Sequence, residues 1–289
     1  MRRVDARAGR AMRAFMSDYQ TIKVDRRDNG VAVLRMHRPE AMNSFNLRMF
    51  GDMLDAFGRL GADQSVRAVV LTGEGRAFCA GADISDGFGS AGLDGVEVER
   101  VDGVPRDTGG VLNLAIGRVD VPVIAAINGS AVGVGLTMTL PCDIRIAAKG
   151  RKYAFPFVRR GIVFDGAASF YLPKLVGFAK AAQWSLTGAY IDPEDGLASG
   201  LFSELLEPED VLPRALELAG DIAVNCSPEA VALNKRLLRD VMHGRVSAFE
   251  AHINESEHLA RMFGEPDCEE GVRAFLEKRP PAFRDRRTA

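Results

Sequence analysis

The stretch from Val121 to Cys142 constrains the fold most, because it contains no charged residue over a length that could cross a bilayer. It is interrupted by Pro122, by the pair Asn128-Gly129 and by further glycines, threonines and a proline. Such residues indicate a strand, a tight turn and a short helix rather than one membrane helix. We therefore reject a membrane span and predict a core strand at Val123–Ile127, followed by a short helix from about Gly135 to Leu140.

The first third of the chain is expected to supply a strand hairpin, a helix and another strand. Residues Thr21–Arg26 and Gly30–Met36 alternate apolar and polar side chains around the turn Asp28-Asn29-Gly30, which is typical of a β-hairpin. Apolar residues recur at helical spacing in Asn46–Leu60, and the apolar run Val66–Thr72 is typical of a strand that is buried on both faces. This part of the chain therefore predicts an α/β core.

Helical patterns dominate the second half of the chain. Ala167–Leu175 and Ala179–Leu186 have helical patterns, and residues 210–277 are predominantly helical. A mixed part followed by an all-helical part predicts one α/β core with a helical C-terminal appendage. We place the core at residues 16–210 and the C-terminal helical region at residues 211–289.

Residues 1–15 carry five arginines and one acid. This composition weakly resembles that of a transit peptide, which would direct the protein to an organelle matrix. The alternatives are a disordered leader or a start codon placed too early, since Met16 opens a sensible start for the domain. We favour the alternatives and expect a cytoplasmic protein.

Composition excludes several classes of function. The chain has 37 basic and 39 acidic side chains, so it creates no bulk field for a nucleic acid or an anionic membrane, and we expect neither as a partner. The four cysteines are far apart, unlike a disulfide framework, and the four histidines lack the spacing of metal ligands. No GxSxG, Walker A or CxxC motif supports a serine hydrolase, a nucleotidase or a redox protein. We therefore expect reduced thiols and no metal site.

Two glycine-rich turns follow predicted core strands. The first is Cys79–Ile84 and the second is Asn128–Gly135. Small residues let a ligand approach the backbone closely, and the N–H groups at the start of a helix attract negative charge. Either turn alone is most often only a tight turn, but a pair of turns that both leave core strands is what an oxyanion hole needs.

Asp165 is a single acid among apolar and small residues, just before a helical segment. One interpretation is an N-cap, for which Asp is among the best residues. The other is a carboxyl group in an apolar pocket, where desolvation would raise its pKa and suit it to proton transfer. The spacing alone leaves both interpretations open.

A series of motifs, in chain order, resembles those of the crotonase superfamily, the enoyl-CoA hydratase/isomerase family. The resemblance covers about residues 19–284. It implies a spiral of ββα units, a C-terminal helical region that builds a homotrimer or a hexamer (a dimer of trimers), and an acyl-CoA substrate. Coenzyme A would then arrive as part of the substrate, with no permanently bound cofactor. The motifs are Arg38–Asn43, Ala77–Ile84, Val123–Gly135, Cys142–Ala147, Leu172–Gly177, Leu186–Gly188, Ser227-Pro228 and Glu270–Arg279.

The same resemblance implies positions for the site. The two oxyanion donors would be the backbone N–H groups of Ala82 and Val134. Lys278 and Phe283 are further candidates, which would reach the CoA of a neighbouring subunit. The residues expected to line the CoA cleft are Ala41, Met42, Ala80, Ala82, Asp83, Ile84 and Ser85.

Departures from the family pattern bear on the reaction. Hydratases that resemble this chain use two glutamates to hold water, and the matching positions here are Thr137 and Phe157. Asp165, eight residues after Phe157, matches a position where dienoyl-CoA isomerases keep an aspartate. The resemblance therefore implies Asp165 as the acid/base of a double-bond isomerisation. Hydration, hydrolysis or dehalogenation with Asp165 as nucleophile, and acyl-CoA binding without catalysis remain alternatives.

Overall fold

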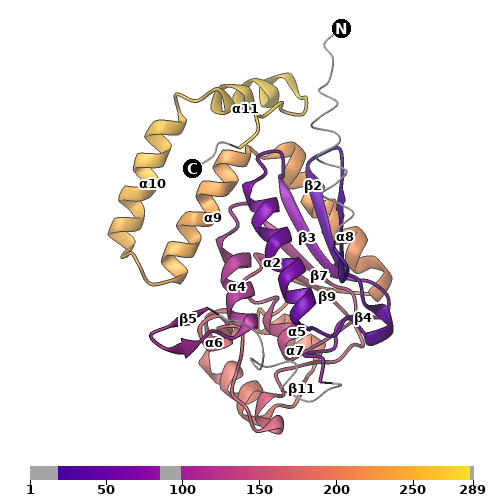
Figure 1. The fold of residues 1–289 in the computed structure, drawn as a ribbon. Coiled ribbons are helices and arrows are strands. Elements are labelled where there is room, and N and C mark those ends of the chain that lie inside the picture. Colours follow the sequence, from indigo (N-terminus) through magenta and orange to yellow (C-terminus); the bar gives the residue numbers. More distant parts are fainter. Residues whose placement is uncertain (1–18, 85–98, 287–289) are drawn as a thin grey trace.

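A computed structural model of the chain describes residues 19–84 and 99–286 (Figure 1). A six-stranded sheet runs in the order β1-β2-β3-β7-β9-β12. The hairpin partners β1 and β2 are antiparallel, and from β2 to β12 the neighbours are parallel. The parallel strands β3 and β7 are buried throughout, as expected for strands covered on both faces. The strands are β1 (Ile22–Arg26), β2 (Val31–Met36), β3 (Ala68–Gly73), β7 (Val123–Ile127), β9 (Ile144–Ala148) and β12 (Glu204–Leu206).

A smaller sheet continues from the larger one, because the chain passes from a strand of the first sheet almost directly into a strand of the second. Its order is β11-β10-β8-β4, and β4, β8 and β10 are parallel. Each repeat of the chain thus gives two strands and then a helix, which is the predicted spiral of ββα units. The strands are β4 (Ala77–Cys79), β8 (Ser130–Val132), β10 (Tyr153–Ala154) and β11 (Tyr190–Ile191).

Helices cover both faces of the six-stranded sheet (Figure 1). On one face lies α8 (Pro208–Asn225), whose small buried side chains let it pack closely on β2, β3, β7 and β9. On the other face, α2 (Leu47–Ala62) buries Met49, Met53 and Phe57, and the side chain of its N-cap, Asn46, accepts a hydrogen bond from the Met49 amide. The predicted core boundary at residue 210 falls inside α8, and the division into a core and a C-terminal region remains our proposal.

The remaining elements lie around the smaller sheet and in the C-terminal part. Figure 1 shows α10 and α11 away from the sheets, and α10 has no buried residue. The elements are η1 (Pro39–Ala41), β5 (Arg100–Val101), β6 (Val104–Pro105), α4 (Thr108–Arg118), α5 (Val134–Thr137), η2 (Phe157–Arg160), α6 (Ala168–Thr187), α7 (Pro193–Ala198), α9 (Pro228–Met242), α10 (Ala248–Met262) and α11 (Pro266–Glu277).

Most sequence predictions of elements are confirmed. The hairpin, the first helix, the strand Val123–Ile127 and the helical C-terminal part are present. The two helical patterns after residue 166 belong to α6, which is interrupted at Gly177 by a φ of 75°. Helix α4 has no counterpart among the predictions. The predicted leader, residues 1–15, lies outside the described residues.

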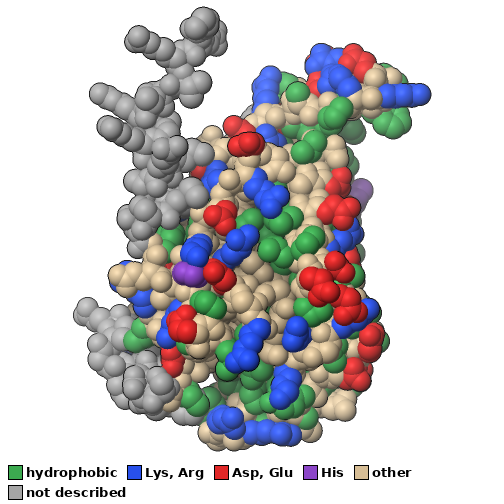
Figure 2. Space-filling model, turned by 90° about the vertical axis from the view of Figure 1, so that its right-hand side faces the viewer, with side chains coloured by type: hydrophobic (Ala, Val, Ile, Leu, Met, Phe, Trp, Pro, Cys, Tyr) green, Lys and Arg blue, Asp and Glu red, His purple; other side chains and the backbone are tan. Residues whose placement is uncertain are grey.

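None of the helices described in residues 19–84 and 99–286 is long and apolar enough to span a membrane. The uncharged stretch from Val121 to Cys142 instead forms β7, β8 and α5. On the face shown in Figure 2, acidic and basic side chains are interspersed rather than separated by sign. This distribution agrees with the balanced charge of the sequence.

Candidate active site

The ends of the two glycine-rich segments lie side by side, because residues 80–84 follow β4 and residues 133–135 follow its parallel neighbour β8, which lies inside the segment Asn128–Gly135. Strand β4 pairs with β8 through Ala77 with Ser130 and Cys79 with Ala131, so both turns leave the same edge of the smaller sheet. A Cβ atom on Gly135 would lie 2.3 Å from the carbonyl oxygen of Cys79. Only a glycine therefore lets the first turn of α5 pack against the end of β4, which brings the segment of Val134 next to the segment of Ala82.

The backbone amides of Ala82 and Val134 have no acceptor among the described residues. A parallel bridge joins Phe45 to Ala82, but its hydrogen bonds use the Gly81 carbonyl and the Asp83 amide on either side of Ala82. Val134 is the first residue of α5, where helical amides have no partner within the helix. Within residues 19–84 and 99–286, neither amide donates to an acceptor of the chain. Two donors without an acceptor at neighbouring strand ends are compatible with the predicted oxyanion hole, which stays a prediction.

Asp165 lies beside α5, and its carboxylate does not cap a helix. The Thr137 hydroxyl donates a hydrogen bond of 2.6 Å to Oδ1 of Asp165. Thr137 is three residues after Val134 on α5, so one short helix carries a predicted oxyanion donor and a contact to the carboxylate. The N-cap of α6 is Ala167, in a left-handed conformation and without a side-chain bond. The N-cap interpretation of Asp165 was therefore wrong.

The surroundings of Asp165 favour its protonated form. The pKa of Asp165 is raised from 3.8 to about 6: burial is the largest cause, the hydrogen bond from Thr137 opposes it, and the charge of Asp107 adds to it. Phe157 and Phe164 pack edge to face with their ring centroids 5.9 Å apart. A Cβ on Gly133 would lie 3.9 Å from the Phe157 ring, so an aromatic wall reaches the start of α5.

Two polar residues of this site, Asp107 and Asn113, were missed by sequence reasoning. Asp107 is the N-cap of α4, and its Oδ1 also accepts a hydrogen bond of 3.2 Å from the Gly166 amide. Buried Asn113, on α4, donates to the carbonyl oxygens of Thr137 and Gly166 at 2.9 and 2.7 Å. Asp is a common N-cap residue, so Asp107 could have indicated the start of a helix. The residues after Asp107 lack apolar side chains at clear helical spacing, so no helix was predicted there.

The structure brings together the predicted segments of the CoA cleft. The amide of Ala80 donates to the carbonyl of Met42 at 3.1 Å, so the segments of residues 41–42 and 80–84 are neighbours. Arg38 forms an ion pair of 2.8 Å with Asp83, which ties the two segments further. The side chains of Met42 and Ile84 are exposed, as residues at the mouth of a cleft would be. Ser85 lies outside the described residues.

Lys278 and Phe283 do not join this site in the same chain. Lys278 is the C-cap of α11, and the carbonyl of Phe283 accepts a hydrogen bond from Arg67, which precedes β3. Figure 1 shows α11 at the opposite end of the molecule from α5. The role assigned to these two residues therefore concerns a neighbouring subunit alone, and it stays a prediction.

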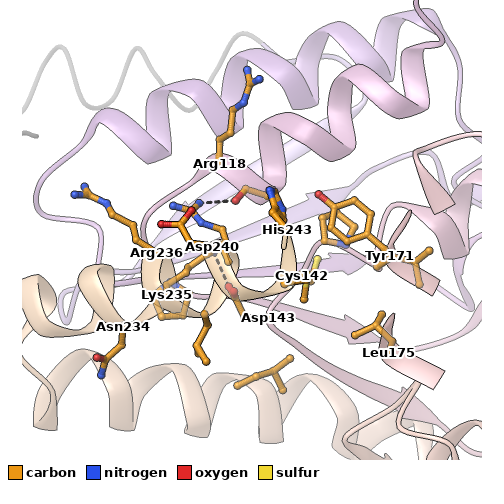
Figure 3. Close-up of a pocket in the computed structure, with 18 of the residues that line it drawn as sticks. Arg118, Cys142, Asp143, Tyr171, Leu175, Asn234, Lys235, Arg236, Asp240 and His243 are labelled. Atoms are coloured by element: carbon orange, nitrogen blue, oxygen red, sulfur yellow. Dashed lines mark hydrogen bonds and ion pairs between the residues drawn. The ribbon is translucent and has the colours of Figure 1, made fainter. Parts of the chain in front are cut away.

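A cavity of about 950 Å³ between α4, α6 and α9 is separate from the predicted site (Figure 3). None of the predicted site residues lines it. Lys235, on α9, forms an ion pair of 2.6 Å with Asp143 and also donates to the carbonyl of Val121. These contacts fasten α9 to the chain around β7 and β9, which is a structural role.

The described residues contain no group of three or more His, Cys, Asp and Glu side chains that could hold a metal ion. The four cysteines form no disulfide, and Cys79 and Cys142 are buried. Burial raises the pKa of each of these two thiols to about 12, so both are neutral at physiological pH. The candidate site therefore offers backbone amides, the partly buried carboxylate of Asp165 and the neighbouring polar side chains of Thr137, Asp107 and Asn113.

Comparisons with known proteins identify the family of this chain. A family model described as enoyl-CoA hydratase/isomerase matches residues 26–286. An enoyl-CoA hydratase of Alternaria alternata is 47% identical over 269 residues, which cover 92% of this chain and 88% of that protein. A 1,2-epoxyphenylacetyl-CoA isomerase of Escherichia coli is 31% identical, with 89% of this chain and 95% of that protein covered.

Solved structures give the same result. The crystal structure of a probable enoyl-CoA hydratase/isomerase from Mycobacterium abscessus has a TM-score of 0.83 and 39% sequence identity to this chain. The similarity covers 92% of this chain and 99% of the other. On its fold and on these relatives, the chain is an enzyme of the enoyl-CoA hydratase/isomerase family, with the crotonase fold.

Proposed function

We propose that the enzyme moves a double bond within an enoyl-CoA thioester, using one carboxylate as the acid and base. The observation that carries the proposal is the hydrogen bond between Thr137 and Asp165. Thr137 occupies a position at which related hydratases have a glutamate. The second such position holds Phe157, which is buried in an aromatic cluster. One carboxylate can move a proton between two carbons, whereas the usual hydration needs two.

The amides of Ala82 and Val134 would bind the thioester oxygen. Removal of a proton from carbon 2 or carbon 4 of an enoyl-CoA leaves a dienolate, whose negative charge rests largely on that oxygen. Donors fixed before the reaction stabilise such charge without reorganising, and each is worth roughly 3–4 kcal/mol in the transition state. The absence of acceptors for both amides among the described residues supports this assignment.

Asp165 would carry the proton. In its ionised form it takes a proton from carbon 2 of a 3-enoyl-CoA, and the electron pair of the broken C–H bond enters the dienolate. It then returns the proton to carbon 4, which yields the 2-enoyl-CoA and restores the ionised carboxylate. A pKa of about 6 suits both steps, because the group is mostly ionised at neutral pH and still readily protonated.

Hydration is the second candidate, because the 47% identical relative is named an enoyl-CoA hydratase. In that reaction Asp165 would activate a water molecule for attack at carbon 3, and carbon 2 would gain a proton. We rank it second because Thr137 already bonds to Asp165 and Phe157 offers no polar atom to hold the water.

We further propose that the enzyme is a homotrimer or a dimer of trimers. Phe249 on α10 and Phe275 on α11 are 72% and 82% exposed. Apolar side chains as exposed as these are typical of a surface that meets another protein chain. In such an assembly Lys278 and Phe283 would be available to the CoA of a neighbouring subunit.

The reaction is tested by incubating the enzyme with 2-enoyl-CoA and with 3-enoyl-CoA in deuterated water and following the products by NMR. A shifted double bond with deuterium at carbon 2 or carbon 4 is the expected result. A 3-hydroxyacyl-CoA would mean that the enzyme is a hydratase. Binding of both compounds without any product would contradict both candidates.

A further inference from the structure

Asp107 lies next to the carboxyl group that the proposed reaction uses. The Oδ1 atom of Asp107 accepts hydrogen bonds from Gly110, inside α4, and from Gly166, the residue directly after Asp165. A Cβ on Gly109 would lie 3.3 Å from Oδ1 of Asp107 and 3.4 Å from Oδ2 of Asp165. The two carboxyl groups therefore flank the same glycine at the start of α4.

We propose that Asp107 is a positioning residue for Asp165: it fixes the Asp165–Gly166 turn, and its negative charge moves the range in which Asp165 exchanges protons to higher pH. This inference rests on the proposed function, because the charge of Asp107 affects the reaction only if Asp165 transfers a proton. The hydrogen bond to Gly166 fixes the backbone, and the charge acts through space on the carboxyl group. Asp107 does not have to touch the substrate for either effect.

Among the described residues, Asp107 is the charged group that acts on the pKa of Asp165, whereas Arg38, whose charge reaches neighbouring Cys79, is paired with Asp83. Strand β4 contributes Cys79, a buried thiol that is neutral at physiological pH because burial raises its pKa to about 12. Helix α5 contributes the Thr137 hydroxyl, α4 contributes the Asn113 amide, and the aromatic wall around Phe157 is apolar. Arg106, which precedes Asp107, pairs with Glu99. Among these neighbours Asp107 supplies the charge, and a like charge favours the protonated form of Asp165.

Capping alone does not require an acid at this position. Asn caps helices as well as Asp does, and its side-chain oxygen could accept from the same amides of Gly110 and Gly166. The substitution Asp107→Asn therefore removes the charge and keeps the hydrogen bonds. A matched control exists in Asp192, the N-cap of α7, whose side chain accepts from the Glu194 amide. Asp192→Asn makes the same chemical change at a helix that does not contribute to the site.

The test compares the wild type, Asp107→Asn and Asp192→Asn in two measurements. One follows the carboxyl ¹³C resonance of Asp165 with pH, assigned by its absence in Asp165→Asn. The other follows kcat/KM for 3-enoyl-CoA with pH. In Asp107→Asn we expect both midpoints to move down by about one pH unit, because a nearby negative charge is lost. Asp192→Asn should keep the wild-type midpoints.

Unchanged midpoints in a folded Asp107→Asn protein would overturn the inference, and so would an equal shift in Asp192→Asn. The NMR titration separates this result from a failure of the proposed function. If Asp165→Asn kept full activity, Asp165 would not be the proton carrier, yet the titration would still report whether Asp107 acts on it. A lower NMR midpoint without a shift in kcat/KM would show the electrostatic effect but overturn its role in the reaction.

Discussion

The hydroxyl of Thr137 donates to the carboxylate of Asp165 across 2.6 Å, from the same helix that offers the free amide of Val134. The proposed acid/base is therefore connected to one proposed oxyanion donor through this short helix. Strand β4 supports the helix, because Gly135 packs directly against Cys79. The chemistry proposed here depends on this short helix more than on any other element.

Replacing Thr137 by Val should raise the pKa of Asp165 above its value of about 6, because the hydrogen bond that favours the ionised form is lost. The rise of kcat/KM with pH should then move up by about one pH unit, since a bond to a charged group is worth roughly 1.5 kcal/mol. Thr139→Val is the control, because the hydroxyl of Thr139 is buried and bonds to Leu136 instead. An unshifted profile in Thr137→Val would contradict the pairing.

Val134→Pro should lower kcat by about 10²–10³, because it removes an oxyanion donor. Proline is tolerated at the first position of a helix, where its missing N–H has no partner within the helix, so the fold should persist. Val134→Ala keeps the amide and should retain most of the activity. Circular dichroism and acyl-CoA affinity check that both variants are folded. Equal activity of the two variants would remove Val134 from the oxyanion hole.

Asp165→Asn should make the protein more stable at pH 8. Folding raises the pKa of Asp165 from 3.8 to about 6, so the folded state binds the proton more tightly and loses stability as the pH rises through this range. The neutral amide avoids this loss, which we expect to be about 2 kcal/mol for a partly buried group. Urea unfolding across pH measures the difference, which should close below about pH 4. A difference independent of pH would contradict the shifted pKa.

Gly135→Ala should unfold or strongly destabilise the protein, by more than about 3 kcal/mol, because the new methyl group would meet the backbone of Cys79 at 2.3 Å. Gly51→Ala is the matched control, since a Cβ at this position on α2 meets nothing within 4 Å. That change should leave stability the same or raise it by about 1 kcal/mol. Thermal unfolding of both variants tests how tightly α5 is fixed against β4.

The sequence predicted the strands well, because buried parallel strands such as Val123–Ile127 are continuous apolar runs bounded by turn residues. It did not predict α4, whose first turn is Thr108-Gly109-Gly110, three poor helix formers. A Cβ on Gly109 or Gly110 would lie within 3.4 Å of the carboxyl groups of Asp107 or Asp165. Tertiary contacts, rather than helix propensity, therefore explain the two glycines. Because α4 was not predicted, Asp107 and Asn113 were not recognised as residues near the site.

For the candidate site, the two turns could be predicted because glycine-rich segments follow apolar strands, whereas the choice of Ala82 and Val134 within them came from the family resemblance. The conflict over Asp165 could not be decided from spacing, since an N-cap and a buried acid occupy the same place before a helix. The structure decides against the cap through the left-handed backbone at Ala167. The hydrogen bond between Thr137 and Asp165 could not be predicted from the sequence either, because it joins residues 28 positions apart.

The role of Asp165 is tested by proton exchange in deuterated water, measured by NMR on 3-enoyl-CoA with the wild type and with Asp165→Asn. The wild type should shift the double bond and introduce deuterium. Asp165→Asn should lose both activities by several orders of magnitude while its affinity for acyl-CoA stays close to that of the wild type. Full exchange and isomerisation by Asp165→Asn would show that Asp165 is not the acid and base of the reaction.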